Sequence, residues 1–225
     1  MIHDEFCPEL ILWDLDGTLV DSSADLVRAT NEAMRTLGYP DVDKEHFARM
    51  VGNGVRYLVS AALPEEARGR ERERAIEVFM EYYRAHIADE TRYFEGIPEL
   101  LADLPVSHAI VSNKREDLCR ALVRALDSQD WFQEIVGGDT FLNRKPHPQP
   151  VLEMINRFSA DPSRTVMIGD SILDVESGLK AGVKTIGVTW GFGDPLEKSE
   201  VKPDYVFRKV SEMADFLRQA CLGKV

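Results

Sequence analysis

The sequence predicts an α/β fold, with a doubly wound, Rossmann-like parallel sheet as its core and a helical cap inserted after the first strand. Short, nearly unbroken apolar runs alternate with segments in which apolar residues recur every three or four positions. This alternation is typical of buried parallel strands separated by covering helices. The stretch 22–89 breaks it, because that stretch carries helical patterns and no convincing strand.

Six segments are predicted as strands because each is short, apolar and rich in β-branched residues. The longer ones are LILWD at 10–14, HAIVSN at 108–113, TVMIGD at 165–170 and KTIGVTW at 184–190, and the shorter ones are EIVGGD at 134–139 and DYVF at 204–207. Helices that alternate with these strands are predicted over 115–127, 148–158, 172–182 and 211–222.

Inside the stretch that lacks strands, apolar residues at helical spacing predict a helix in each segment. The segments are 23–38, 44–52, 55–64 and 65–87, of which the mixed charges at 65–74 indicate a solvated helix face. We therefore expect an α/β core built from 1–19 and 90–225, with a helical cap domain over 20–89.

The composition of the chain argues against several classes of protein, among them nucleic-acid-binding, membrane-spanning and disulfide-rich proteins. The chain of 225 residues carries a net charge of −12, which disfavours nucleic acid as a partner. No window approaches the roughly 18 unbroken apolar residues of a membrane span, and the acidic N-terminus does not resemble a signal peptide. The three widely spaced cysteines, Cys7, Cys119 and Cys221, argue against a disulfide framework. We expect a cytoplasmic protein without a membrane partner.

Polar residues follow the ends of several predicted strands. Ligands bind beyond the carboxyl ends of the strands in a doubly wound sheet, so these residues are candidates for one site. They are Asp14, Asp16 and Gly17 after the first strand, Ser112 and Asn113 after the second, Lys145 before a proline near a helix start, and Asp170 and Asp174 after the TVMIGD strand.

Such a set is suited to phosphoryl transfer. Converging carboxylates are costly without a cation, and Mg²⁺ is the most plausible hard ion for oxygen ligands. One aspartate of the Asp14–Asp16 pair can attack phosphorus, while the other protonates the leaving oxygen and then activates water. Gly17 permits a sharp turn, where its N–H can help to hold the phosphoryl group. The expected partner is a small phosphorylated metabolite.

Four motifs, DLDGTLVDS, SN, RKPHP and GDSILD, occur in the order that resembles the haloacid dehalogenase superfamily. The resemblance covers essentially the whole chain. It implies that Asp14 is the nucleophile and Asp16 the general acid and base, with the Asp16 backbone carbonyl also binding the metal. It further implies phosphate binding by Ser112 and Lys145, metal ligation by Asp170, and support of the metal by Asp174 through water.

Within that superfamily, three segments look like phosphoglycolate phosphatases. They are RMVGNGVRYLVSAAL in the insert, KPHPQPVL, and the strand end GVTWGFG. The resemblance implies that the loop Gly52-Asn53-Gly54 closes over the substrate with Arg56 nearby. Asn53 and Arg56 are therefore expected to bind the substrate, with 2-phosphoglycolate as the best single candidate.

Other activities remain open on the same motifs. A sugar-phosphate hydrolase, a pyrophosphate hydrolase or a phosphosugar mutase would use the same groups. Haloacid dehalogenation is disfavoured, because it needs neither an acid at Asp16 nor a metal. A non-catalytic phospho-receiver domain also gathers acids and a lysine, but Asp16 and a large cap argue against it.

Overall fold

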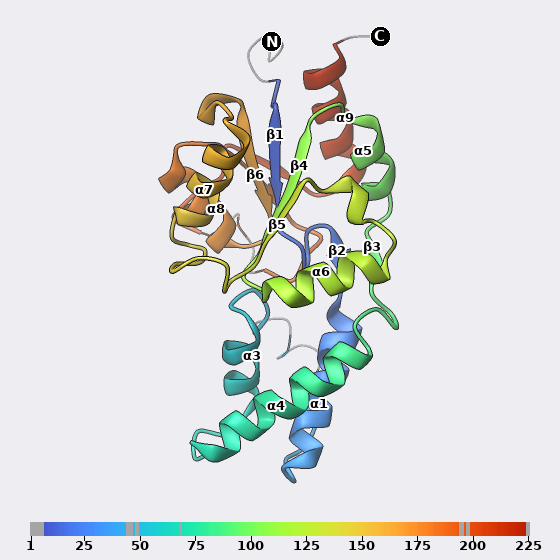
Figure 1. Cartoon of the computed structure of the whole chain (residues 1–225), viewed down its shortest axis with the longest axis vertical. Helices are drawn as coiled ribbons and strands as arrows, with labels where there is room; N and C mark the ends of the chain where they lie inside the picture. Colours follow the sequence, from blue (N-terminus) through green and yellow to red (C-terminus); the bar gives the residue numbers. More distant parts are fainter. Residues whose placement is uncertain are drawn as a thin grey trace.

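The computed structural model describes residues 7–43, 47, 50–67, 69–193, 196 and 199–223. Its core is a six-stranded parallel sheet in the order β5-β4-β1-β6-β7-β8, so the first strand lies near the centre (Figure 1). The strands are β1 (Leu10–Trp13), β4 (Ser107–Val111), β5 (Glu134–Val136), β6 (Thr165–Gly169), β7 (Lys184–Val188) and β8 (Tyr205–Phe207). The α/β fold class expected from the sequence is confirmed.

Most of the predicted strands run past the observed strand ends, and the excess includes the residues proposed for chemistry. β1 ends at Trp13, β4 at Val111 and β6 at Gly169. Asp14, Ser112 and Asp170 each follow directly, where the backbone leaves the sheet. The apolar runs thus mark the strands, and their polar ends mark the edge at which a site forms.

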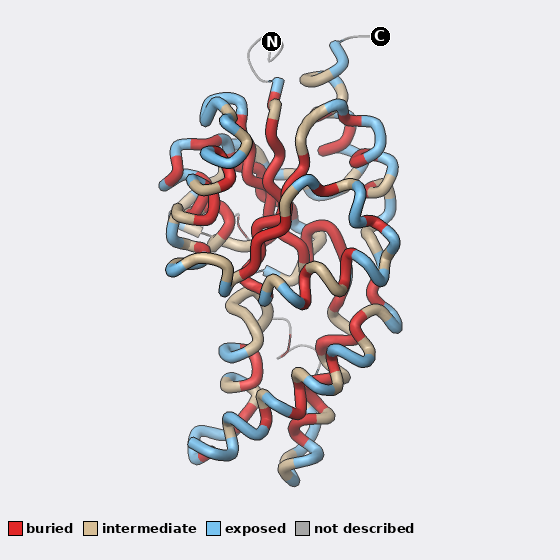
Figure 2. Tube along the Cα trace, in the orientation of Figure 1, coloured by how far each residue is buried: buried red, intermediate tan, exposed pale blue. Residues whose placement is uncertain are grey.

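Helices cover both faces of the sheet, which explains why β1 is apolar along its whole length and the neighbouring strands are largely apolar. Ile11 and Trp13 of β1 pack into the same cluster as residues of α5, α6 and α9, whereas Leu10 and Leu12 pack with residues of α7 and α8. All four of these β1 side chains are fully buried, and the strands form a continuous buried centre in Figure 2. The covering helices are α5 (Ile97–Asp103), α6 (Glu116–Ala125), α7 (Gln149–Phe158), α8 (Ile172–Ala181) and α9 (Val210–Leu222).

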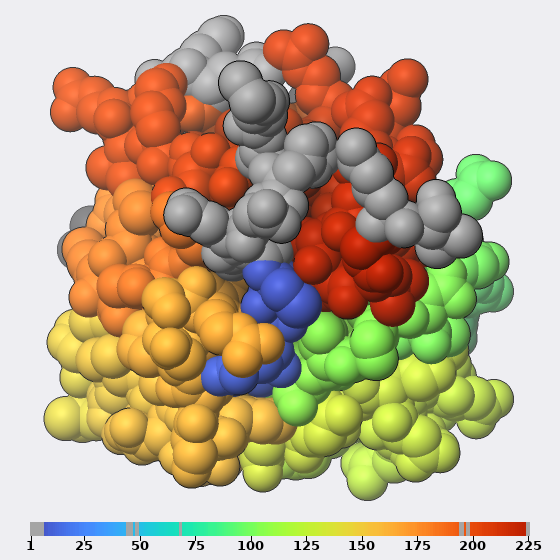
Figure 3. All heavy atoms as spheres, turned by 90° about the horizontal axis from the view of Figure 1, so that it is seen from above, coloured from blue at the N-terminus to red at the C-terminus, as the bar shows by residue number. Residues whose placement is uncertain are grey.

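The end of the molecule at which β1 starts is seen in Figure 3. There the beginning of β1 (blue) lies between the orange segments that contain β6 and α7 and the green segments that contain α5 and β4. The red C-terminal helix α9 lies beside it. The opposite end of the sheet, where the strands finish, faces the helices of the insert (Figure 1).

The helices described in full within the insert are α1 (Ser23–Thr36), α3 (Val55–Ala62) and α4 (Arg70–Ala85), and α1 packs along α4. The chain enters and leaves it through a short antiparallel ribbon, in which β2 (Val20–Asp21) pairs with β3 (Arg92–Tyr93). None of the described residues within 22–89 lies in a strand, as expected. The division into a core and a cap domain with boundaries at 20 and 89 stays a prediction.

Two details of the predicted insert need comment. The helix predicted over 44–52 falls largely outside the described residues, because 44–46 and 48–49 are not among them. The helix predicted over 65–87 begins later, at Arg70, because Gly69 has a left-handed φ of 58° and the described residues before it form turns. Across the part of the chain that the structure describes, no helix is both long and apolar enough to span a bilayer.

Candidate active site

The turn after β1 carries the two carboxylates that the sequence singled out. Asp14 is buried, and Gly17 takes a left-handed φ of 87° that makes the turn possible. A side chain at Gly17 would collide with the Asp170 carboxylate. The Gly17 N–H donates to the Val20 carbonyl at 2.9 Å, which corrects the expectation that it helps to hold a phosphoryl group. The role of Gly17 is to permit the turn and the close approach of Asp170.

Lys145 joins three segments at the ends of the strands. Its Nζ donates to Asp14 Oδ1 at 2.8 Å, to Asp174 Oδ1 at 2.5 Å and to the Val111 carbonyl at 2.6 Å. The side chain is only 2% exposed. Burial acts to lower the pKa of Lys145, but Asp14 and Asp174 raise it above its ordinary value, so the lysine stays charged. All three of its hydrogens are engaged, so binding a phosphate would require it to exchange one of these partners.

The two acids after β6 are held by different donors. Asp170 Oδ2 accepts hydrogen bonds from the Phe192 N–H at 2.7 Å and the Gly193 N–H at 3.0 Å. Asp174 Oδ2 accepts from the backbone N–H and the hydroxyl of Ser171, which caps helix α8. Helix α8 and the loop after β7 therefore fix both carboxylates.

Asp14, Asp170 and Asp174 form a group that fits a divalent cation. Each offers one carboxylate oxygen, and these oxygens lie within 4.8 Å of one another. Burial raises the pKa of Asp14 to about 6, and burial together with Asp14 and Asp174 raises that of Asp170 to about 7. A hard cation with oxygen ligands would relieve this cost. Asp174 Oδ1 accepts from the Lys145 ammonium and Oδ2 from Ser171, whereas within the described residues Asp170 Oδ1 accepts only a long hydrogen bond from the Thr18 hydroxyl at 3.4 Å. Contact through water therefore suits Asp174 better than direct ligation.

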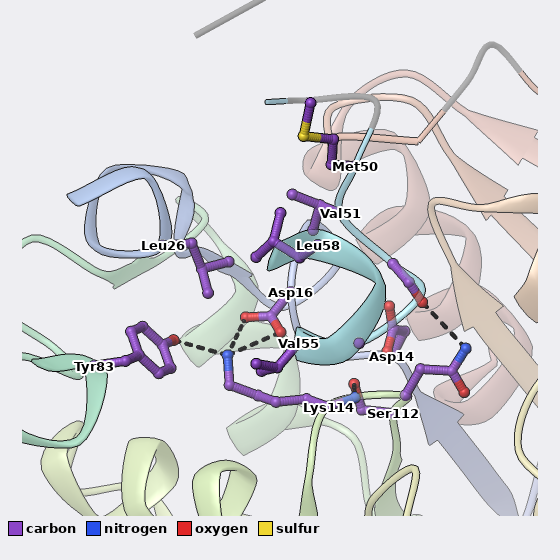
Figure 4. A pocket seen from close by; sticks show the side chains of 13 residues that line it. Asp14, Asp16, Leu26, Met50, Val51, Val55, Leu58, Tyr83, Ser112 and Lys114 are labelled. Carbon is purple, nitrogen blue, oxygen red and sulfur yellow. Dashed lines mark hydrogen bonds and ion pairs between the residues drawn. The ribbon is translucent and has the colours of Figure 1, made fainter. Parts of the chain in front are cut away.

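Asp16 is held by partners outside that group. Lys114 Nζ lies 2.9 Å from each Asp16 carboxylate oxygen, and the Ser22 hydroxyl donates to Oδ1 at 2.6 Å. Lys114 also donates to the Tyr83 hydroxyl of α4 at 2.7 Å (Figure 4). The sequence reasoning missed Lys114, Tyr83 and Ser22. A signal existed for Lys114 alone, which directly follows the polar pair at the end of β4.

Ser112 and Asn113 differ in what they can still bind. Ser112 Oγ accepts from the Lys114 N–H at 3.3 Å, which leaves its own O–H free to donate. Asn113 Nδ2 donates to the Gly52 carbonyl at 3.1 Å and to the Lys145 carbonyl at 3.0 Å. Both Asn113 N–H groups are thus used within the protein, so Asn113 ties the loop before α3 to the Lys145 segment instead of presenting a donor to phosphate.

A cavity of about 40 Å³ lies between the carboxyl ends of the strands and the insert (Figure 4). The side that we call the core wall is polar and is formed by Asp14, Asp16, Ser112, Asn113 and Lys114. The side that we call the insert wall is apolar except for one hydroxyl, and is formed by Leu26, Met50, Val51, Gly52, Gly54, Val55, Leu58 and Tyr83.

The structure does not bring the two substrate residues predicted in the insert into this cavity. Asn53 lies between two glycines that line it but does not line it itself. Arg56 is 67% exposed and pairs with Glu73 at 2.6 Å, in an adjoining groove of about 790 Å³ that shares Gly54, Val55 and Asn113 with the cavity. The phase of α3 is the reason, because Val55 and Leu58, three residues apart, face the cavity and turn Arg56 away.

Three kinds of comparison agree on the family. The family model for haloacid dehalogenase-like hydrolases matches residues 11–188. The chain is 32% identical over 211 residues to a phosphoglycolate phosphatase of Aquifex aeolicus, which covers 92% of this chain and 96% of that protein. It is 35% identical over 215 residues to a phosphoglycolate phosphatase of Chromobacterium violaceum, with coverages of 92% and 96%.

Two further proteins are similar to this chain: one relative named for another substrate, and one protein of known structure. An N-acetylmuramic acid 6-phosphate phosphatase of Pseudomonas aeruginosa is 32% identical over 214 residues, covering 93% of this chain and 95% of that protein. The crystal structure of a predicted phosphoglycolate phosphatase from Haemophilus somnus superposes with a TM-score of 0.88 at 27% identity, covering 95% of this chain and 98% of that one. The chain belongs to the haloacid dehalogenase-like hydrolase family.

Proposed function

We propose that this protein is a Mg²⁺-dependent phosphatase that hydrolyses a small phosphorylated metabolite through an aspartyl-phosphate on Asp14. The observation that carries the proposal is the buried Asp14, which pairs with Lys145 and lies with Asp16 on one wall of a small cavity. A nucleophile and a proton carrier thus line the same small space. The phosphatase names of the relatives support the same reaction class.

In the first step, an Asp14 oxygen attacks phosphorus. The hydrogen bond from Lys145 occupies Asp14 Oδ1 and leaves Oδ2 for the attack. The bond between phosphorus and the leaving oxygen breaks, and that oxygen keeps the electron pair. Asp16 enters this step as the carboxylic acid, gives its proton to the leaving oxygen and becomes the carboxylate that the second step needs. The Ser112 hydroxyl lies on the same wall, and in this proposal it donates to a phosphoryl oxygen.

In the second step, water attacks the phosphorus of phospho-Asp14, and the Asp16 carboxylate takes its proton. The acyl-phosphate bond breaks, Asp14 recovers its charge and inorganic phosphate leaves. Bound Mg²⁺ would neutralise phosphoryl oxygens and relieve the repulsion among the buried acids. Asp14, Asp170 and the Asp16 backbone carbonyl would hold the ion, with Asp174 supporting it through water.

For the substrate, we propose 2-phosphoglycolate. The cavity of about 40 Å³ supports a small leaving group, while the adjoining groove of about 790 Å³ has room for a larger one. A sugar phosphate is the second candidate, because one relative is named for N-acetylmuramic acid 6-phosphate. We place the reaction in the cytoplasm, which accords with three cysteines that are free in the structure.

Phosphate release from a panel of esters tests the proposal. The panel contains 2-phosphoglycolate, a hexose phosphate, N-acetylmuramic acid 6-phosphate, pyrophosphate and p-nitrophenyl phosphate, each with and without Mg²⁺. We expect turnover that needs Mg²⁺ and the highest kcat/KM for 2-phosphoglycolate. Preference for another ester would replace the substrate and keep the reaction. Stable phospho-Asp14 without turnover would indicate a phospho-receiver, and transfer to a second hydroxyl of a sugar would indicate a mutase.

A further inference from the structure

We propose that Lys114 and Tyr83 are positioning residues that hold the Asp16 carboxylate in place for proton transfer and link it to helix α4 of the insert. We call these two residues the Asp16 clamp. The inference rests on the proposed function, because it assigns the groups through which the proton carrier of that reaction is oriented.

The contacts of Lys114 point to positioning. An ammonium group has three hydrogens. Those of Lys114 serve the two Asp16 oxygens, each at 2.9 Å, and the Tyr83 hydroxyl at 2.7 Å. No donor remains for a substrate. The Lys114 side chain is 4% exposed and that of Asp16 is 12% exposed, so water does little to weaken the pair.

Tyr83 makes this arrangement rigid from the insert side. Its side chain is fully buried, and its ring stacks on Phe79 one helical turn earlier, with centroids 5.5 Å apart. The Lys114 ammonium lies 4.7 Å from the centre of the Tyr83 ring, which adds a cation–π attraction to the hydrogen bond. The lysine is therefore held by the ring as well as by the hydroxyl.

The clamp connects three distant parts of the chain. Asp16 follows β1, Lys114 follows β4, and Tyr83 belongs to α4. Among the described residues, Ser22 is the other side chain that donates to Asp16, and it donates to Oδ1. Removal of Lys114 would therefore leave Oδ2 without a side-chain donor from this part of the chain. A displacement of about 1 Å is enough to cost roughly 100-fold in rate when a catalytic group loses its alignment. The seating of α4 on the core thus sets the alignment of the proton carrier.

The test compares Lys114→Met, Tyr83→Phe and the double variant on two substrates with Mg²⁺ present. One is an alkyl phosphate, whose leaving oxygen needs a proton, and the other is an aryl phosphate, whose better leaving group needs it less. We expect Lys114→Met to lower kcat for the alkyl ester about 100-fold, with a smaller loss for the aryl ester and little change in KM. Tyr83→Phe should lose about 3- to 10-fold, and the double variant should match Lys114→Met, because Tyr83 acts through Lys114.

Matched controls lie close by. Tyr82→Phe changes the neighbouring tyrosine, which stacks on His86 outside the cavity lining, and Lys180→Met removes an exposed lysine that pairs with Glu176. Both should keep normal kinetics. Lys114→Arg restores a donor to Asp16 and should recover part of the alkyl kcat. If Lys114→Met does not fold, Tyr83→Phe still decides the question, because it removes a single hydroxyl.

Three results would overturn the clamp. A loss confined to the KM of carboxylate-bearing substrates would make Lys114 a substrate contact. Equal losses for alkyl and aryl esters would show that proton transfer is not affected, and additive losses in the double variant would separate Tyr83 from Lys114. A wild-type protein that hydrolyses no ester would refute the proposed function instead. The clamp would then be judged by whether Asp16 leaves its present orientation in a crystal structure of Lys114→Met.

Discussion

The two walls of the cavity are built on different principles. On the core wall, Asp14 is paired with Lys145 and Asp16 with Lys114, so each charge has a fixed partner. The insert wall offers aliphatic side chains such as Leu58 and a single hydroxyl, that of Tyr83. We infer that the two walls have different roles. The strand ends supply the reactive groups, and the insert supplies the shape that selects a substrate.

The largest effect should come from the core wall. Asp14→Asn keeps the size of the side chain but removes the charge and the nucleophile. We expect kcat to fall by at least about 10³-fold, because the other groups act through this one. Phosphate release measures the loss, and a thermal unfolding curve checks that the variant folds. Asp215→Asn, which changes a carboxylate of α9 that is 74% exposed, is the matched control. Ordinary turnover by Asp14→Asn would end the covalent mechanism.

The next effect is the pH dependence of stability that the buried carboxylates Asp14 and Asp170 produce. In the metal-free protein, the pKa of Asp14 is raised to about 6 and that of Asp170 to about 7, against an unperturbed value of 3.8. The folded state therefore binds more protons than the unfolded chain between about pH 4 and pH 7. Stability that these groups contribute at pH 4 is lost as the pH rises through 7.

Mg²⁺ should reverse that loss, because it binds the ionised carboxylates. We expect it to raise the unfolding midpoint of EDTA-treated protein more at pH 8 than at pH 5, by about 2–4 °C for each kcal/mol recovered. Thermal unfolding at the two pH values, with and without Mg²⁺, measures this difference. Asp170→Asn, which lacks the more strongly shifted group, should reduce it. An equal Mg²⁺ effect at both pH values would place the ion elsewhere.

A smaller effect should come from the insert wall. Leu58 is 4% exposed and lines the cavity, so Leu58→Ala should cost about 2–5 kcal/mol of stability and widen the cavity. The ratio of kcat/KM for a bulky phosphate ester to that for 2-phosphoglycolate should rise. Val59→Ala is the control, because Val59 is fully buried on the same helix but does not line the cavity. An unchanged ratio in Leu58→Ala would remove the insert wall from substrate selection.

The smallest effect should come from Arg56, which belongs to neither wall. Its pairing with Glu73 is exposed to water, so Arg56→Ala should change stability by less than about 1 kcal/mol. We expect kcat/KM for 2-phosphoglycolate and p-nitrophenyl phosphate to stay within about twofold of the original values. Steady-state kinetics on both esters measure this, with Glu73→Ala as the partner control. A selective loss for 2-phosphoglycolate would bring back the sequence-based expectation that Arg56 meets its carboxylate.

The convergence of the core-wall residues could be predicted from the sequence, while their roles stay predictions. Asp14, Ser112 and Asp170 follow apolar runs, and parallel strands place their carboxyl ends at one edge, so the convergence of these residues follows from topology. The RKPHP motif predicted that Lys145 lies at the same edge of the sheet. In the structure its ammonium group contacts Asp14 and Asp174. The strands of the sheet and most of the helices that cover it were likewise predicted from the spacing of apolar residues alone.

The rest depends on contacts that no local pattern encodes. Lys114 and Tyr83 are far apart in the chain, and their meeting requires α4 to be docked on the core. The placement of Arg56 depends on the rotation of α3, which a one-residue shift in its start would change by about 100°. The use of the Gly17 N–H inside the turn depends on where the Val20 carbonyl points, which the residue types do not reveal.

The ribbon of β2 and β3 has a consequence for how such a protein can be rebuilt. Val20 faces Tyr93 and Asp21 faces Arg92, so the chain leaves the core and returns to it through neighbouring residues. The entropy of closing a loop grows only with the logarithm of its length, so a longer or shorter segment between these two strands adds little cost. The ribbon is thus a natural graft point, at which one helical insert can be exchanged for another on the same sheet, provided that the new insert supplies the contact that Tyr83 makes with Lys114.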